Sequence, residues 1–164
     1  MKVIFLDIDG VINNWTDLDI LFEECEDSSI YSSIDGFSKK SIDVVKKMEN
    51  ELGAKIVLCS TWRKDEHIDE VKKVFNIFDR TPVLTGKTYR DHLFKYSEYI
   101  PRHIEIQSWL DDHENVTNFV ILDDDPDASN EILKPHHLLI HDEFGLDETD
   151  LPLIREAMSL ERSI

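Results

Sequence analysis

Short, unbroken runs of mostly apolar residues mark out the chain at positions 3–6, 55–59 and 119–122, with a weaker run at 138–140. The three strong runs are four or five residues long and rich in β-branched side chains. Runs of this kind are typical of strands that are buried on both faces, as in a parallel sheet. The pattern therefore predicts a parallel sheet, with the strand at 3–6 in its middle, flanked by those at 55–59 and 119–122.

Apolar residues at helical spacing lie between these runs. One predicted helix begins after Ser38 and ends before Gly53, a second is capped by Asp65, a third has Pro101 in its first turn, and a last one is capped by Asp150. The residues expected to face the core are Ile42, Val45, Met48 and Leu52; Ile68, Val71 and Phe75; Ile104 and Leu110; and Leu153, Ala157 and Leu160. Strands that alternate with helices predict an α/β fold of three layers, with helices on both faces of the sheet.

Residues 13–37 do not fit this alternation, because they combine an acidic cluster with a Ser-rich stretch. We expect an irregular loop or hairpin excursion there, forming a short flap beside the site. Neither an internal repeat nor an interdomain linker is visible, and a length of 164 residues is typical of one domain. The sequence therefore predicts a single domain over residues 1–164.

The chain is strongly acidic, with 18 Lys and Arg residues against 35 Asp and Glu and a net charge of −17. This charge argues against an extended nucleic-acid surface and against binding to anionic membranes. A phosphorylated substrate would have to meet a local cation or a metal ion. The two cysteines, Cys25 and Cys59, suit a reducing compartment, and no apolar stretch approaches the roughly 18 residues that span a bilayer. We expect a cytoplasmic protein.

Two acidic clusters follow two of the predicted strands directly. Asp7 and Asp9 come after the first run, and Asp123 and Asp124 come after the run at 119–122. The carboxyl ends of parallel strands share one edge of a sheet, where ligands bind. A lone Asp after a strand is usually a turn or cap residue, but two converging pairs repel each other and favour a bound cation. Hard oxygen ligands without Cys or His make Mg²⁺ the predicted cofactor, with these four residues as candidate ligands.

Polar residues also follow the run at 55–59. The hydroxyl of Ser60 or Thr61 can donate to a phosphoryl oxygen or serve as a cap for the next helix. Arg63 can bind a phosphate or form a surface ion pair. The residues alone leave each pair of alternatives open.

The chain resembles the haloacid dehalogenase (HAD) superfamily of phosphohydrolases in three ordered motifs: DIDGV after the first strand, Ser after the second and DD after the third. A wider pattern is similar to the HAD domain of Swiss-army-knife RNA repair proteins: DxDGxxN, xVLxSxWR, ILDD and a late GL within FGLDETD. This wider resemblance covers nearly the whole chain. It implies a HAD-like Rossmannoid fold. The segments available for an insertion, 14–37 and 64–101, are too short for a full cap domain.

The resemblance implies a role for each carboxylate. Asp7 would be the nucleophile that forms an aspartyl-phosphate, and Asp9 would be the general acid and then the base for water. Mg²⁺ would lie between Asp7, the backbone carbonyl of Asp9, and Asp123 or Asp124. Its charge would let an anionic carboxylate approach an anionic phosphate.

The resemblance also implies residues around the phosphoryl group. Ser60 would hold an oxygen, with the adjacent Thr61 as the alternative. The cation of the superfamily's third motif would be Arg102, at the start of the predicted helix before the DD strand, with Lys87 and Arg90 as rivals. The candidate substrate-binding residues are Gly10, Thr61 and Arg63.

The function that follows is a Mg²⁺-dependent phosphomonoesterase. An uncapped site suits a large substrate, such as a polynucleotide 3′-phosphate end. Trp15, Tyr31 or Trp62 could stack on a base or sugar there, although core packing is the simpler explanation for each. The alternatives are a small-molecule phosphatase or nucleotidase, and a non-catalytic HAD-like binding module. The last is disfavoured, because Asp7, Asp9, a hydroxyl and the DD pair are all present.

Overall fold

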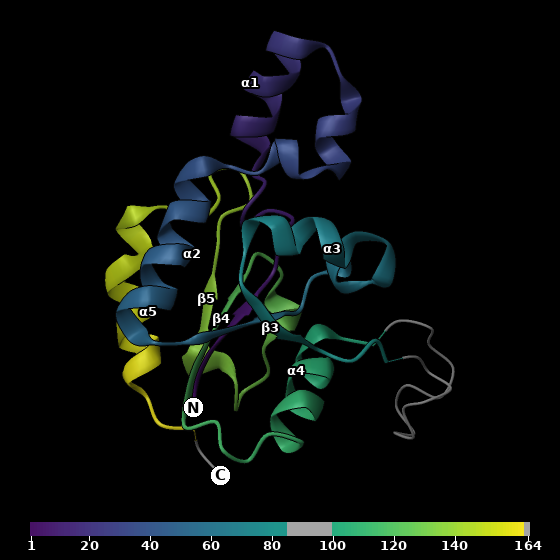
Figure 1. Cartoon of the computed structure of the whole chain (residues 1–164). Coiled ribbons are helices and arrows are strands. Elements are labelled where there is room, and N and C mark those ends of the chain that lie inside the picture. The colour runs from purple at the N-terminus through teal and green to yellow at the C-terminus, as the bar shows by residue number, and fades with distance from the viewer. Residues whose placement is uncertain (85–99, 163–164) are drawn as a thin grey trace.

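The computed structural model describes residues 1–84 and 100–162, and these form an α/β fold around one parallel sheet (Figure 1). The strand order is β3-β2-β1-β4-β5. The strands are β1 (Lys2–Leu6), β2 (Lys55–Leu58), β3 (Ile77–Arg80), β4 (Asn118–Asp123) and β5 (His137–Leu139). Strand β1 is central, with Leu6 opposite Leu58 on one side and Leu122 on the other. The predicted centre of the sheet and both of its flanking strands are confirmed.

The edge strand β3 has no counterpart among the apolar runs of the sequence. Its four residues alternate between half-buried and exposed. An edge strand of this kind lacks the continuous apolar run that marks a strand buried on both faces. The other edge strand, β5, begins one residue earlier than the weak run at 138–140.

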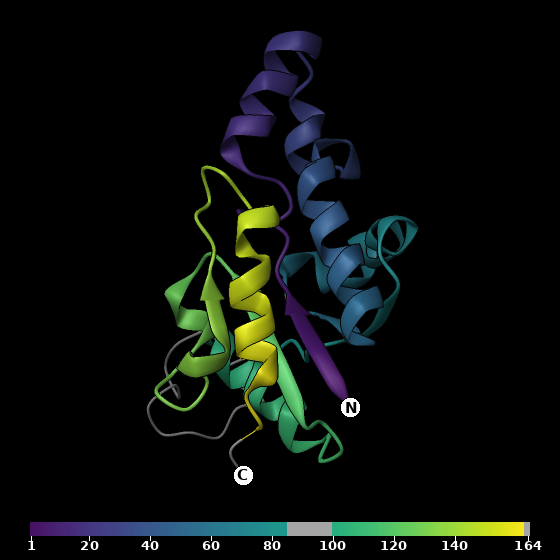
Figure 2. The same ribbon diagram turned by 90° about the vertical axis from the view of Figure 1, so that its left-hand side faces the viewer.

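Helices cover both faces of the sheet (Figures 1 and 2). Helices α2 (Lys39–Leu52), α3 (Asp65–Val74) and α5 (Leu151–Ser159) share a core with one face, to which β1 contributes Ile4 and Leu6. Helix α4 (Arg102–Asp111) packs on the other face, against Val3 and Phe5. All four of these β1 residues are fully buried, which explains why the sequence of β1 is apolar throughout. The predicted three-layer architecture is confirmed.

The predicted helices are present, but the faces of two of them differ from the prediction. Helix α2 follows Ser38 and ends before Gly53, as predicted. Asp65 is the first residue of α3 and Lys64 is its cap, so the predicted cap at Asp65 is wrong. In α4 the buried apolar residues are Ile106, Trp109 and Leu110, and Ile104 is only half-buried. The prediction is wrong for Leu153 in α5 and for Leu160, which follows the last residue of α5, because the structure exposes both; the buried face of α5 is Leu151, Ile154, Ala157 and Met158. Both stripes of α5 are apolar, and contact with the sheet decides which one is buried.

Residues 13–37 are helical, so the expectation of an irregular loop or hairpin is wrong. The segment contains α1 (Trp15–Cys25) and two 3-10 helices, η1 (Ser28–Ser32) and η2 (Ile34–Gly36). Asn14 caps α1 by accepting a hydrogen bond from the Asp17 amide at 2.9 Å. Of the residues in α1 only Leu18 is buried, so α1 lacks the buried apolar stripe that would have revealed it. The segment projects beyond the carboxyl ends of the strands (Figures 1 and 2).

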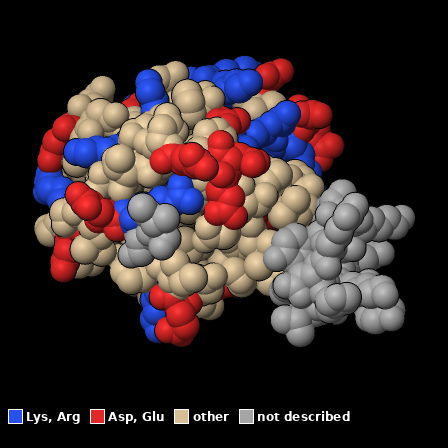
Figure 3. Space-filling model, turned by 90° about the horizontal axis from the view of Figure 1, so that it is seen from below, with Lys and Arg blue, Asp and Glu red and all other residues tan. Residues whose placement is uncertain are grey.

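The surface carries charges of both signs. On the face seen in Figure 3, Lys and Arg side chains are interspersed with Asp and Glu. Among the helices of residues 1–84 and 100–162, none has the combination of length and hydropathy required to cross a bilayer.

Candidate active site

Three carboxylates meet at the carboxyl end of the two central strands. The Asp7 amide donates to the Leu122 carbonyl at 2.9 Å, which continues the pairing of β1 with β4 and brings Asp7 level with Asp123. Asp7, Asp123 and Asp124 each offer an oxygen within 4.8 Å of the others. The two acidic clusters of the sequence therefore converge, as the parallel sheet predicts.

The electrostatics of this cluster call for a positive charge. Burial raises the pKa of Asp7, and Asp9 adds to that effect. Burial also raises the pKa of Asp123 to about 8 and that of Asp124 to about 6, in both cases with a further contribution from the charge of Asp7. At neutral pH the Asp123 carboxyl therefore favours its protonated form unless a cation compensates the negative charge of its neighbours.

The residues of the cluster fit a magnesium ion. Oδ2 of Asp123 is buried and has no hydrogen-bond partner within the described part of the chain. A buried carboxylate oxygen without a partner is costly unless a ligand satisfies it. The cluster offers only carboxylate oxygens, the donors that Mg²⁺ prefers.

A glycine is required at position 10, because the Asp124 side chain packs directly against its backbone. It follows β1 with a φ of 74°, a left-handed conformation that favours glycine. A Cβ at this position would lie 2.3 Å from Oδ2 of Asp124. The structure thus gives Gly10 a packing role, and its contact with substrate stays a prediction.

Arg102 lies against the cluster from the first residue of α4. Its Nη1 is 3.0 Å from Oδ1 of Asp7 and 3.6 Å from Oδ2 of Asp123, and it also donates to the Cys59 carbonyl. Burial would lower the pKa of Arg102, but the negative charges around it, those of Asp7 and Asp123 among them, raise it above its usual value. Arg102 therefore stays charged beside the candidate nucleophile. The rival cations Lys87 and Arg90 lie outside the described residues.

Asp9 has different surroundings, although it is only two residues from Asp7. Nε1 of Trp62 donates to both of its carboxylate oxygens, at 3.0 and 3.1 Å. Nδ2 of Asn13 donates to Oδ1 at 2.8 Å. These two neutral donors fix the orientation of the Asp9 carboxylate, a role that was not predicted for either residue from the sequence. The signal that could have found them is their presence in the patterns DxDGxxN and SxWR.

Ser60 and Thr61 are adjacent but differ in exposure. Ser60 is fully buried, and its hydroxyl lowers the pKa of Asp7 against the larger effect of burial. The same oxygen accepts from the Trp62 amide at 3.4 Å, which caps the 3-10 helix η3 (Thr61–Arg63). Thr61 is exposed. Ser60 is therefore a cap, and its buried hydroxyl acts on the pKa of Asp7.

Arg63 forms a buried ion pair and not the surface pair that the sequence suggests. Its Nη2 lies 2.7 Å from Oε2 of Glu105, and both side chains are almost fully buried. Its Nη1 donates to the carbonyls of Cys59 and Ser60 at 3.0 and 2.7 Å. This arrangement favours a role in joining the end of β2 to α4 over a phosphate contact.

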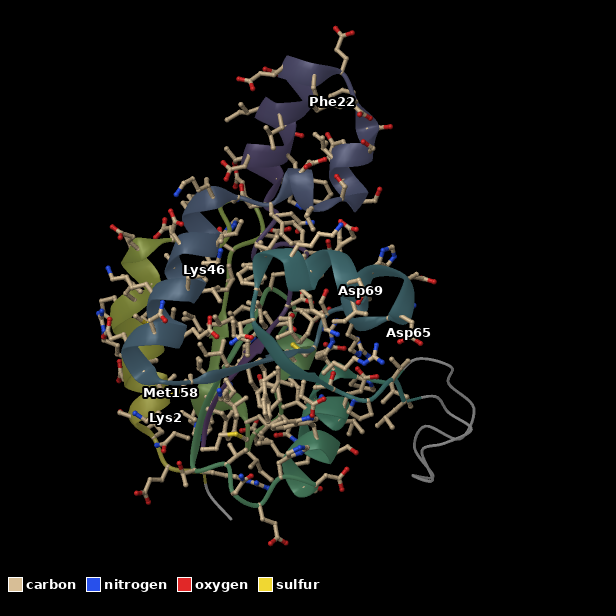
Figure 4. The ribbon with its side chains drawn as sticks, in the orientation of Figure 1. Lys2, Phe22, Lys46, Asp65, Asp69 and Met158 are labelled. Carbon is tan, nitrogen blue, oxygen red and sulfur yellow. The ribbon has the colours of Figure 1, made fainter. Side chains whose placement is uncertain are left out.

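The three aromatic candidates have separate locations. Trp62 is 7% exposed and packs in the core, as expected, whereas Trp15 is 53% exposed on α1, so core packing is wrong for it. Tyr31, on η1, is partly buried. Figure 4 shows Phe22 in the same projecting segment, whereas Lys2 lies near the opposite end of the sheet. Tyr31 and Trp62 both line a cavity of about 250 Å³ that reaches Asp9.

Comparison with known families agrees with this geometry. The model of the HAD domain in Swiss Army Knife RNA repair proteins matches residues 3–151. The chain belongs to this family. The matched region contains the three clustered carboxylates, Asp9 and Arg102. Neither the curated proteins nor the solved structures gave a match. Membership in the HAD superfamily points to a hydrolase.

Proposed function

We propose that the protein is a Mg²⁺-dependent phosphomonoesterase that works through an aspartyl-phosphate intermediate. The observation that carries this proposal is the buried cluster of Asp7, Asp123 and Asp124, with Arg102 held against Asp7 at 3.0 Å. A nucleophilic carboxylate needs neighbouring positive charge to approach a phosphate dianion. Arg102 supplies one such charge from the protein itself.

In this mechanism the Asp7 carboxylate attacks phosphorus, so that an O–P bond forms while the bond to the leaving oxygen breaks. Arg102, which lies 3.0 Å from Asp7, and Ser60, whose hydroxyl lowers the pKa of Asp7 against the larger effect of burial, would hold the phosphoryl oxygens. Asp7, Asp123 and Asp124 would hold Mg²⁺, whose positive charge would offset the repulsion between the carboxylates and the phosphate.

Asp9 would handle the proton in both steps. It would protonate the leaving oxygen during attack and then remove a proton from the water that hydrolyses the aspartyl-phosphate. The hydrogen bonds from Trp62 and Asn13 would keep its carboxylate in one orientation for both transfers.

The substrate we favour is a phosphorylated nucleic-acid end, with 3′-phosphatase activity. Membership in a family of RNA repair proteins supports a nucleic-acid substrate. The net charge of −17 is compatible with recognition of the terminal phosphate through few contacts, because extended contact with a strand needs a basic surface. The second candidate is a phosphatase for free nucleotides, which the small cavity beside Asp9 favours.

The test is a phosphatase assay with an aryl phosphate, nucleoside monophosphates and 3′- and 5′-phosphorylated oligonucleotides, in Mg²⁺ and in excess EDTA. We expect turnover in Mg²⁺, loss of turnover in EDTA, and the highest kcat/KM on 3′-phosphorylated ends. Full activity in EDTA would overturn the assignment of Mg²⁺.

The Asp7→Asn variant tests the nucleophile in the same assay. Turnover should fall by at least about 10³-fold, as when other covalent nucleophiles are removed, and the wild-type protein should form an acid-stable phosphoryl adduct that the variant does not form. Asp69→Asn is the matched control, because Asp69 is an exposed carboxylate on α3 (Figure 4). A folded Asp7→Asn protein with wild-type turnover would show that a different group attacks phosphorus.

A further inference from the structure

A cavity of about 250 Å³ lies beside Asp9, between the projecting segment and the connection from β2 to α3. Tyr31 of η1 lines it from the projecting segment, and Trp62 and His67 line it from the part of the chain that follows β2. Lys64 and Glu66 also line it. The cavity therefore joins the candidate general acid to a segment that the mechanism above does not use.

The chemistry of the proposed function determines which part of a substrate would enter this cavity. A general acid must come within about 2.6–3.2 Å of the oxygen that it protonates. The group attached to the leaving oxygen must then lie next to Asp9. Because the cavity is lined by Asp9, it is where that leaving group would be held.

The walls of the cavity carry aromatic rings that their neighbours hold in place. The Trp62 ring packs against Phe37 and His67, with centroids 5.2 and 5.4 Å away, and its N–H is engaged by Asp9. The Tyr31 ring packs against Phe22 of α1 at 5.9 Å. Rings fixed in this way lose little conformational entropy when a flat ligand stacks on them.

The charges and the size of the cavity define the ligand further. Lys64 and Glu66 carry opposite charges, so apart from Asp9 the lining is balanced and suits a neutral group. A volume of about 250 Å³ lies just below the range of about 300–1,000 Å³ that holds drug-sized ligands. The cavity therefore suits a single neutral, ring-bearing unit with polar edges.

We propose that this cavity binds the nucleoside that carries the scissile phosphate, with Tyr31 stacking on its base. This inference rests on the proposed phosphatase function and names the leaving group for it. A free nucleotide and the terminal nucleoside of a strand present the same chemistry. The projecting segment would then determine specificity through Tyr31.

The test measures equilibrium binding, so that it does not depend on turnover. Calorimetry with the Asp7→Asn protein in Mg²⁺ would compare two matched pairs of ligands. One pair is adenosine 5′-monophosphate and ribose 5-phosphate, and the other is a 3′-phosphorylated trinucleotide with and without its terminal base. We expect the base to tighten binding by about 5–150-fold in at least one pair, and the pair that responds identifies a free nucleotide or a strand end as the source.

A second substitution, added to the Asp7→Asn protein, shows which residue is responsible for the preference for the base. Tyr31→Ala should abolish the preference for the base and leave binding of the base-free ligand within about two-fold. Tyr31→Phe, which keeps the ring, should retain the preference. Phe78→Ala is the matched control, because Phe78 is a half-exposed aromatic residue on β3 that does not line the cavity.

The outcomes separate this proposal from the proposed function. If the base adds nothing in either pair, or if Tyr31→Ala weakens the ligands with and without base equally, the cavity does not bind a nucleoside. If the base preference holds and depends on Tyr31 while the wild-type protein hydrolyses none of these phosphates, the binding site stands and the phosphatase assignment fails.

Discussion

Asp7 and Asp9 are two residues apart, but their side chains lie among different neighbours. Asp7 is buried beside a guanidinium, whereas Asp9 is exposed and accepts hydrogen bonds from an indole and an amide. Charged neighbours suit a nucleophile that meets a phosphate dianion. Neutral donors orient a carboxylate without pairing it with a charge, which suits a group that must gain and lose a proton.

Substituting Asp9 should separate the two steps of the reaction. Asp9→Asn removes the group that donates and accepts the proton, and general acid–base catalysis of this kind accelerates a reaction by about 10²–10⁴-fold. A nitrophenyl phosphate scarcely needs an acid for its leaving group, so the variant should show a burst of nitrophenolate and then slow turnover. A sugar phosphate should fail at the first step. Rapid-mixing assays distinguish these patterns, and equal losses at the first step with both substrates would contradict the role of Asp9.

The indole N–H of Trp62 is predicted to act through Asp9. Trp62→Phe retains an aromatic ring but deletes the donor to both carboxylate oxygens of Asp9. The loss of a hydrogen bond to a charged group changes a rate constant by roughly 10- to 100-fold. We expect kcat to fall by that factor on alkyl phosphates and much less in the burst with nitrophenyl phosphate. Trp109→Phe is the control, since Trp109 donates to Asp79 at 2.7 Å and packs on the other face of the sheet. Equal losses for both substrates would indicate a structural effect only.

At the scale of elements, the site depends on how β2 is joined to α4. Arg63 follows β2 and pairs with Glu105 of α4, the helix whose first residue is Arg102. Nη1 of Arg102 and of Arg63 both donate to the carbonyl of Cys59. The Arg63–Glu105 pair therefore connects the end of one strand to the helix that presents the cation of the site.

Removing one partner of this pair should lower the free energy of unfolding far more than replacing both partners with apolar residues. Glu105→Ala leaves the Arg63 guanidinium buried and unpaired, which should lower the free energy of unfolding by about 3–5 kcal/mol. The double variant Arg63→Met, Glu105→Leu should recover most of that loss, because no charge is left buried. Urea denaturation measures both. A loss below about 1 kcal/mol in the single variant would show that the pair does not stabilise the fold.

At the scale of the whole molecule, the sheet topology gathers acidic residues from both ends of the sequence. Strands β1 and β4 are neighbours, although more than a hundred residues separate them along the chain. The acids that follow these strands are thereby crowded at one edge of the sheet. In the metal-free state, burial and the neighbouring carboxylates raise the pKa of Asp123 to about 8, so this carboxyl favours its protonated form at neutral pH and the repulsion is reduced.

This crowding predicts the pH dependence of stability. Asp123 has a pKa of about 8 when folded and about 3.9 when unfolded, so around neutral pH the folded state binds more protons. Without Mg²⁺, the stability should therefore fall as the pH rises from 7 to 9. Mg²⁺ should remove or reverse this slope, because it binds the deprotonated carboxylates.

Thermal unfolding across this pH range, with and without Mg²⁺, would test the prediction. The Asp123→Asn variant should show a flat profile without metal, and Asp69→Asn should behave as the wild type. A metal-free wild-type protein whose stability rises from pH 7 to 9 would contradict the crowding of these acids.

The centre of the fold and the chemistry of the carboxylate cluster could be predicted from local features of the sequence. Strands β1, β2 and β4 are buried on both faces, so their sequences are unbroken apolar runs, and Asp7 and Asp123 stand at the ends of two of these runs. These features are local, because burial acts on consecutive residues. The parallel arrangement then brings the acids together without further information.

Features that depend on contacts between residues far apart in the sequence could not be predicted in this way. Trp62 binds Asp9 across 53 positions, and Arg63 binds Glu105 across 42. Whether an arginine forms a buried pair, or which apolar stripe of α5 faces the sheet, depends on what packs beside it. Helix α1 and strand β3 bury few or none of their residues, so they show no hydrophobic periodicity in the sequence. Their positions depend on contacts with the rest of the fold.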